Sequence, residues 1–144
     1  MYRHTQVGWI VLGVCGVLAV VLAWQLPRAP GAPLPLVALP QLVLLAVAVL
    51  FAALTVQVDE REIELSFGPG LIRKRIALAD VTECRAVRNP ALAGWGIRWL
   101  GHGWLYNVSG LDAVELSMRN GSVLRIGTDE PDRLEAAISA RLAH

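Results

Sequence analysis

Acidic residues are missing from the first 58 positions of this 144-residue chain, and the first of them is Asp59. The same stretch holds only two basic residues, Arg3 and Arg28, whereas residues 59–144 hold eleven basic and twelve acidic ones. Charged residues make up 17% of the chain, against about 25% in an average soluble domain. So uneven a distribution excludes an ordinary soluble globule. The formal net charge of +1 offers no basic surface for nucleic acid, so we expect no nucleic-acid partner.

Cysteine and histidine are also scarce. Cys15 lies in the uncharged part and Cys84 in the charged part, so they are unsuited to a disulfide. His4, His102 and His144 have no metal-ligand spacing with the cysteines or with carboxylates. His102, between two glycines, is either a solvated loop residue or a ligand or base without a partner motif. There is no phosphate-binding glycine loop and no nucleophile motif. We therefore expect no catalytic residues, no metal and no cofactor.

Two long hydrophobic runs fill the uncharged part. Thr5–Pro27 and Ala29–Val58 contain no charged side chain, and both exceed the roughly 20 residues that a membrane-spanning helix needs. A proline-rich segment separates them and cannot continue a helix. Pro40 suits a first helical turn. The sequence therefore predicts a transmembrane hairpin in residues 1–58, with helices at about 7–26 and 40–56.

Tryptophans and basic residues orient this predicted hairpin. Trp9 and Trp24 are about 22 Å apart along a helix, as expected of anchors at the two membrane interfaces. Basic residues after the second run predict an inner-membrane protein with both termini in the cytoplasm. These residues are Arg61, Arg73, Lys74 and Arg75. A cleaved signal peptide, or two helices buried in a soluble core, are the alternatives.

Residues 59–144 form the second predicted domain, with short strands followed by one helix. Apolar residues alternate with polar ones on both sides of a turn at 59–61, which indicates a first β-hairpin. Further strands are expected at about 71–77, 81–88, 94–98 and 104–108, where glycines and prolines separate the apolar runs.

The last hairpin and the last helix can be predicted in more detail. A three-residue loop at 119–121 pairs Leu116 with Leu124 and Val114 with Ile126, whereas a two-residue loop would set apolar residues opposite charges. A helix at about 130–142, capped by Thr128 or Asp129, has one apolar face. We expect this helix to dock on the sheet.

An ordered set of short motifs resembles the second half of the domain found in bacterial pleckstrin-homology-like membrane proteins, and the resemblance covers about residues 55–144. It consists of Gly94–Arg98, Tyr106–Gly110, Val114–Leu116, Gly121, Ile126–Asp129, Pro131 and Leu134. The resemblance implies a membrane-anchored α+β protein, in which an antiparallel bent sheet or partly open barrel of about seven strands is capped by the C-terminal helix. It also implies two preceding transmembrane helices, and no catalysis.

Two groups of residues are candidate contacts for a partner or for lipid. The first is the basic run Arg73, Lys74 and Arg75, although strand alternation puts Lys74 on the face opposite its neighbours. The second is a stretch rich in glycine and tryptophan, which is either part of the core or an exposed aromatic surface. It contains Trp95, Arg98, Trp99 and Trp104.

The sequence therefore predicts a non-catalytic, membrane-anchored module for protein binding or scaffolding, with an unknown membrane or cytoplasmic protein as its partner. One alternative is a reader of anionic lipid surfaces that contacts the bilayer through Arg73, Lys74, Arg75 and Arg98. Another is a subunit of a larger membrane complex packed through the hairpin, which could also form a homo-oligomer.

Overall fold

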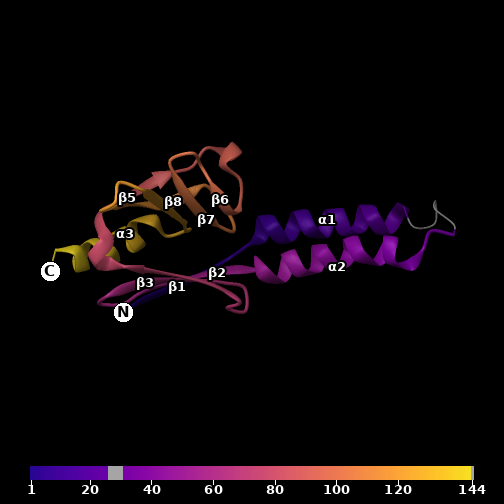
Figure 1. Ribbon diagram of the computed structural model, residues 1–144, viewed down its shortest axis with the longest axis horizontal. Coiled ribbons are helices and arrows are strands. Elements are labelled where there is room, and N and C mark those ends of the chain that lie inside the picture. The colour runs from indigo at the N-terminus through magenta and orange to yellow at the C-terminus, as the bar shows by residue number, and fades with distance from the viewer. Residues whose placement is uncertain (26–30, 144) are drawn as a thin grey trace.

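The computed structural model describes residues 1–25 and 31–143, which form an α+β fold with two open β-sheets (Figure 1). A helical hairpin projects from one end of the sheets, and the C-terminal helix lies at the other end. The hairpin consists of α1 (Trp9–Gln25) and α2 (Leu34–Leu50), and the C-terminal helix is α3 (Pro131–Leu142).

The first sheet is antiparallel throughout, with the strand order β1-β2-β3-β4. Val56 pairs with Leu65 and Val58 with Ile63, which confirms the predicted first hairpin. All four of these side chains are buried on the inner face of the sheet. The strands are β1 (Tyr2–Val7), β2 (Ala53–Val58), β3 (Glu62–Phe67) and β4 (Ile72–Ala77).

The second sheet has the order β5-β8-β9-β7-β6, and its β7–β9 pair is parallel. Leu116 pairs with Leu124 and Val114 with Ile126, so the predicted three-residue loop is confirmed. Gly121 in that loop has a φ of 83°, a conformation that favours glycine. The strands are β5 (Val81–Arg88), β6 (Gly96–Trp99), β7 (Gly103–Asn107), β8 (Asp112–Met118) and β9 (Val123–Gly127).

Helix α3 packs against β5 and β8 and confirms the predicted C-terminal helix. Leu134 and Ile138 are completely buried in the core between the sheets. The predicted cap is only partly present, because the Glu130 N–H donates to Thr128 Oγ1 at 3.1 Å while the N-cap residue, Glu130, makes no side-chain cap bond.

The transmembrane hairpin and the multi-pass inner-membrane location predicted from the sequence are wrong. Among the helices of residues 1–25 and 31–143, none combines the length and the hydrophobicity that a membrane span requires. Helices α1 and α2 have 17 residues each, or about 25 Å, against a hydrocarbon core of about 30 Å. The uncharged runs are longer than the helices because β1 and β2 use the residues at the base of the hairpin. The predicted helices included Val7 of β1 and residues 53–56 of β2.

The prolines of α2 occupy other helix positions than predicted. Helix α2 begins and ends earlier than the predicted 40–56 range, with Pro35 in its first turn and Pro40 inside it. The predicted connection between the helices includes Pro27, Arg28 and Pro30, which lie outside the described residues. Trp9 and Trp24 are exposed near the two ends of α1.

The predicted seven-stranded antiparallel barrel is also wrong. The described residues form nine strands in two sheets that no ladder joins, and the β7–β9 pair is parallel. One of these strands, β1, precedes the first helix and was not predicted. Its inward-facing residues, Tyr2, His4 and Gln6, are not aliphatic, so the strand lacks the usual apolar alternation.

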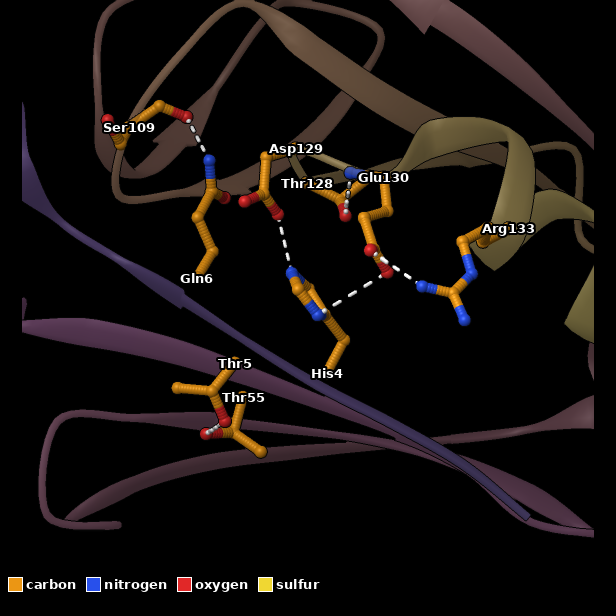
Figure 2. Close-up of polar contacts among 9 residues, drawn as sticks. All are labelled: His4, Thr5, Gln6, Thr55, Ser109, Thr128, Asp129, Glu130 and Arg133. Atoms are coloured by element: carbon orange, nitrogen blue, oxygen red, sulfur yellow. Dashed lines mark hydrogen bonds and ion pairs between the residues drawn. The ribbon is translucent and has the colours of Figure 1, made fainter.

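Strand β1 also connects the two sheets through polar contacts (Figure 2). His4 Nε2 lies 2.5 Å from Asp129 Oδ1, and His4 Nδ1 lies 3.4 Å from Glu130 Oε2. Gln6 Nε2 donates to the Ser109 carbonyl oxygen at 2.9 Å. We call these contacts the β1 seam. They hold one side of the two-sheet structure together.

Candidate functional site

The two sheets are not joined where β4 faces β7 and β9 of the second sheet, and a cleft of about 470 Å³ lies there. This volume is within the range of ligand pockets, about 300–1,000 Å³. We call it the inter-sheet cleft. Four consecutive residues of β4 line it, together with residues of three strands and one loop of the second sheet. The full lining is Lys74, Arg75, Ile76, Ala77, Asp80, Trp104, Tyr106, Met118, Asn120, Ser122, Val123 and Leu124.

Lys74 is the cationic residue on the inner side of this cleft. In the β3–β4 ladder it pairs with Leu65 of β3, which is completely buried. Because directly paired residues project from the same face of a sheet, the Lys74 side chain projects from the inner face. Because β4 is an edge strand, the lysine nevertheless remains exposed. Within the described part of the chain, its ammonium group has no carboxylate or hydrogen-bond partner. It is therefore available to an acidic ligand.

Aromatic rings form the opposite wall. Trp104 is 46% exposed and packs edge-to-face against Trp99, with ring centroids 5.5 Å apart. Tyr106 is buried, and this burial raises the pKa of its hydroxyl above the ordinary value. Asp80 lies at the end of the cleft as an exposed carboxylate. The cleft thus combines a cation, an anion and an aromatic wall.

The other two members of the basic run lie on the outer face of the first sheet. Arg75 Nε is 3.1 Å from Glu64 Oε2, and Arg73 Nε donates to the Gly70 carbonyl oxygen at 2.9 Å. The structure therefore separates the side chains of Arg73 and Arg75 from that of Lys74, as strand alternation predicts. The three residues do not form one basic patch.

The glycine- and tryptophan-rich stretch is also divided. Trp95 is half-buried, and its Nε1 donates to the Gly110 carbonyl oxygen at 3.1 Å, which makes it a structural residue. Arg98 is exposed beside Gly94, outside the cleft. Trp99 and Trp104 remain exposed. The stretch is therefore part core and part surface.

A cluster of charged residues around Glu115, on the outer face of the five-stranded sheet, was not predicted. Glu115 is 5% exposed and accepts hydrogen bonds from Arg85 at 3.0 Å and from Arg125 at 2.7 Å. Burial alone would raise the pKa of the Glu115 carboxyl, but the two arginines outweigh burial and lower it. The arginines satisfy both carboxylate oxygens, so the cluster is structural. The predicted hairpin register contained its signal, because it sets Glu115 opposite Arg125.

No protein-family model matches the chain, and no curated protein matches it. The resemblance to pleckstrin-homology-like proteins therefore stays an untested prediction. In residues 1–25 and 31–143, no group of three or more histidine, cysteine and carboxylate side chains could hold a metal ion. The function must be inferred from the site itself.

Sequence reasoning identified Lys74, Arg75 and Trp104 as candidates but not the site that they share. It missed Asp80 and Tyr106, which line the same cleft. No motif links these positions, because the cleft exists only once β4 and β7 face each other across the two sheets.

Proposed function

We propose that this protein is a non-catalytic binding module that holds a segment of a partner protein in the inter-sheet cleft. The observation that carries the proposal is the unpaired, inward-facing Lys74 opposite the exposed ring of Trp104. A partner that supplies a carboxylate for Lys74 and apolar area for Trp104 gains a charge-assisted contact and aromatic burial together.

The dispersal of the basic residues does not favour a reader of anionic lipid surfaces. Such a reader needs several cations on one face, since each adds only about 1 kcal/mol. Here Arg75 is paired with Glu64, Lys74 points into the cleft, and Arg98 lies elsewhere. A single lysine beside aromatic rings suits a protein segment better than a charged plane.

The test is photocrosslinking in cells with p-benzoylphenylalanine in place of Trp104. We expect a protein adduct that disappears when the same chain also carries Lys74→Glu. A matched control places the crosslinker at Leu92, which is 96% exposed outside the cleft, and should not give that adduct. An absent adduct, or one that persists with Lys74→Glu, would contradict the proposal.

A second candidate function, assembly through the hairpin, is favoured by the exposed apolar surface of α1 and α2. Their described residues include no charged side chain, so a partner surface must itself be apolar, and the same hairpin in a second copy meets that condition. A groove of about 340 Å³ between the helices, lined in part by Gly16 and Ala19, gives room for close approach. The exposed large apolar residues are Trp9, Val14, Val17, Leu18, Val20, Val21, Trp24, Leu34, Leu36, Leu39, Leu42, Val43, Leu45 and Val49.

Sedimentation equilibrium of the purified chain tests this second candidate. A dimer or larger oligomer is expected, and Leu45→Glu, which puts a charge on the groove, should shift it toward monomer. Leu71→Glu is the control, because Leu71 is 73% exposed in the β3–β4 turn. A monomeric wild-type chain would exclude self-assembly.

A further inference from the structure

The β4 strand has a free hydrogen-bonding edge, and this edge faces the inter-sheet cleft. The Leu78 N–H donates to the Arg61 carbonyl oxygen, next to the paired residues Glu62 and Ala77. Antiparallel ladders alternate, so the backbone groups of Lys74 and Ile76 point at β3. The backbone groups of Arg73, Arg75 and Ala77 therefore point away from the sheet.

The lining of the cleft agrees with this direction. Neighbouring side chains of a strand point to opposite faces, so four consecutive residues can line one cleft only if the edge of the backbone faces it. Residues 74–77 are such a run. No other strand of the described residues pairs with that side of β4. The cleft therefore presents unpaired N–H and C=O groups.

We propose that the partner segment binds as an added β-strand on the free edge of β4, inside the inter-sheet cleft. This inference rests on the proposed function and gives the partner a chemistry. An added strand takes its affinity from backbone hydrogen bonds and its specificity from alternate side chains.

The side chains of the cleft define which segment fits. The partner residue opposite Lys74 faces the cleft and is acidic, because that ammonium has no counter-ion within the protein. The partner residues two positions to either side lie opposite Ile72 and Ile76 on the same face and are apolar. The end of the partner segment that lies nearest Asp80 carries a basic residue, because Asp80 is an exposed carboxylate in the lining of the cleft. The partner is thus an extended segment with an acidic residue between apolar ones and a basic residue near one end.

A phage library of random twelve-residue peptides, selected on the purified full chain, tests the chemistry. We expect enrichment of an acidic residue flanked at alternate positions by apolar ones. A synthetic peptide with the selected sequence should bind at least tenfold more weakly to the Lys74→Glu chain. The proposed peptide chemistry is overturned if no peptide is enriched, or if the enriched peptides bind both chains equally.

A proline at one position of the β4 edge tests the strand pairing. Arg75→Pro removes the outward N–H, and an edge strand tolerates proline where the N–H faces away from the sheet. Arg75→Ala is the matched control, since both variants lose the ion pair with Glu64. Binding of the selected peptide should be at least tenfold weaker for the proline variant than for the alanine variant. Equal affinities would overturn the added strand.

The peptide offers a second measurement that does not depend on how the protein variant folds. Methylation of those peptide backbone nitrogens whose N–H points at β4 should weaken binding at least tenfold. Methylation of the alternate nitrogens, whose N–H points away from β4, should not. If both methylated peptides bind normally, strand pairing is wrong. A Trp104 crosslink that still depends on Lys74 would in that case leave the proposed function intact.

Discussion

His4 Nε2 lies 2.5 Å from Asp129 Oδ1, although the two residues are 125 positions apart in the chain. The contact joins the first strand of one sheet to the segment that leads into the C-terminal helix (Figure 2). Together with the Gln6 bond to Ser109, it closes one side of the fold and leaves the side with the inter-sheet cleft open. The open side contains Lys74 and Trp104, on which the functional proposal rests.

Loss of the His4 contacts in the β1 seam should lower the free energy of unfolding by a small amount. Because the Asp129 side chain is 57% exposed, solvent weakens its contact with His4. We expect His4→Ala to lower the free energy of unfolding by about 1 kcal/mol. Arg3→Ala, on the exposed side of the same strand, should change it by less than about 0.5 kcal/mol. Urea unfolding measures both. If His4→Ala and Arg3→Ala changed the free energy of unfolding equally, the contacts of His4 in the β1 seam would contribute no stability of their own.

The buried carboxylate of Glu115 should matter more than an exposed one. Glu115→Gln weakens the bonds to Arg85 and Arg125 in a buried position, and we expect a loss of about 2–3 kcal/mol in unfolding free energy. Glu64→Gln, which affects the exposed pair with Arg75, should cost less than about 1 kcal/mol. Urea unfolding at neutral pH compares the two variants. A similar loss in both would contradict the structural role of the cluster.

The same cluster predicts a pH dependence. The pKa of Glu115 is lower in the folded chain than its ordinary value of about 4.3 in an unfolded one. In that interval the unfolded chain binds more protons, so the stabilisation is full above about pH 4.3 and is lost as the pH falls through the folded value. Urea unfolding between pH 7 and pH 3 should show a shallower acid loss for Glu115→Gln than for wild type. Parallel curves would refute the assignment.

Glycine at position 103 is required by the parallel β7–β9 pair. Gly103 pairs with Val123, and a Cβ atom there would overlap the Val123 carbonyl oxygen. Gly103→Ala should therefore cost about 2–3 kcal/mol, because backbone must move. Gly13→Ala in α1 meets no heavy atom within 4 Å and should not destabilise the chain. Thermal unfolding of the two variants checks this, and an unchanged Tm for Gly103→Ala would argue against the parallel pairing.

Local pattern predicted much of the sheet region correctly. The register of Leu116 with Leu124 follows from which faces of two adjacent strands are apolar, and that information lies within a dozen residues. The C-terminal helix follows in the same way from the spacing of Leu134 and Ile138. Such elements bury one face, so their pattern is visible in the sequence.

The hairpin and the cleft could not be predicted in this way. An uncharged run does not show where a strand gives way to a helix, so the predicted spanning helices included Val7 of β1 and residues 53–56 of β2. Lys74 and Trp104 lie 30 positions apart on different sheets, and only the arrangement of the sheets brings them to one cleft. The order of the second sheet, with its parallel pair, has no local signal either.

The most direct test of the account is residue-resolved amide hydrogen exchange along β4, with and without the selected peptide. Bound peptide should slow exchange at the outward amides of Arg73, Arg75 and Ala77. The inward amides of Lys74 and Ile76, which already bond to β3, should change little. Unchanged exchange at Arg73, Arg75 and Ala77 under saturating peptide would contradict a partner strand in the inter-sheet cleft.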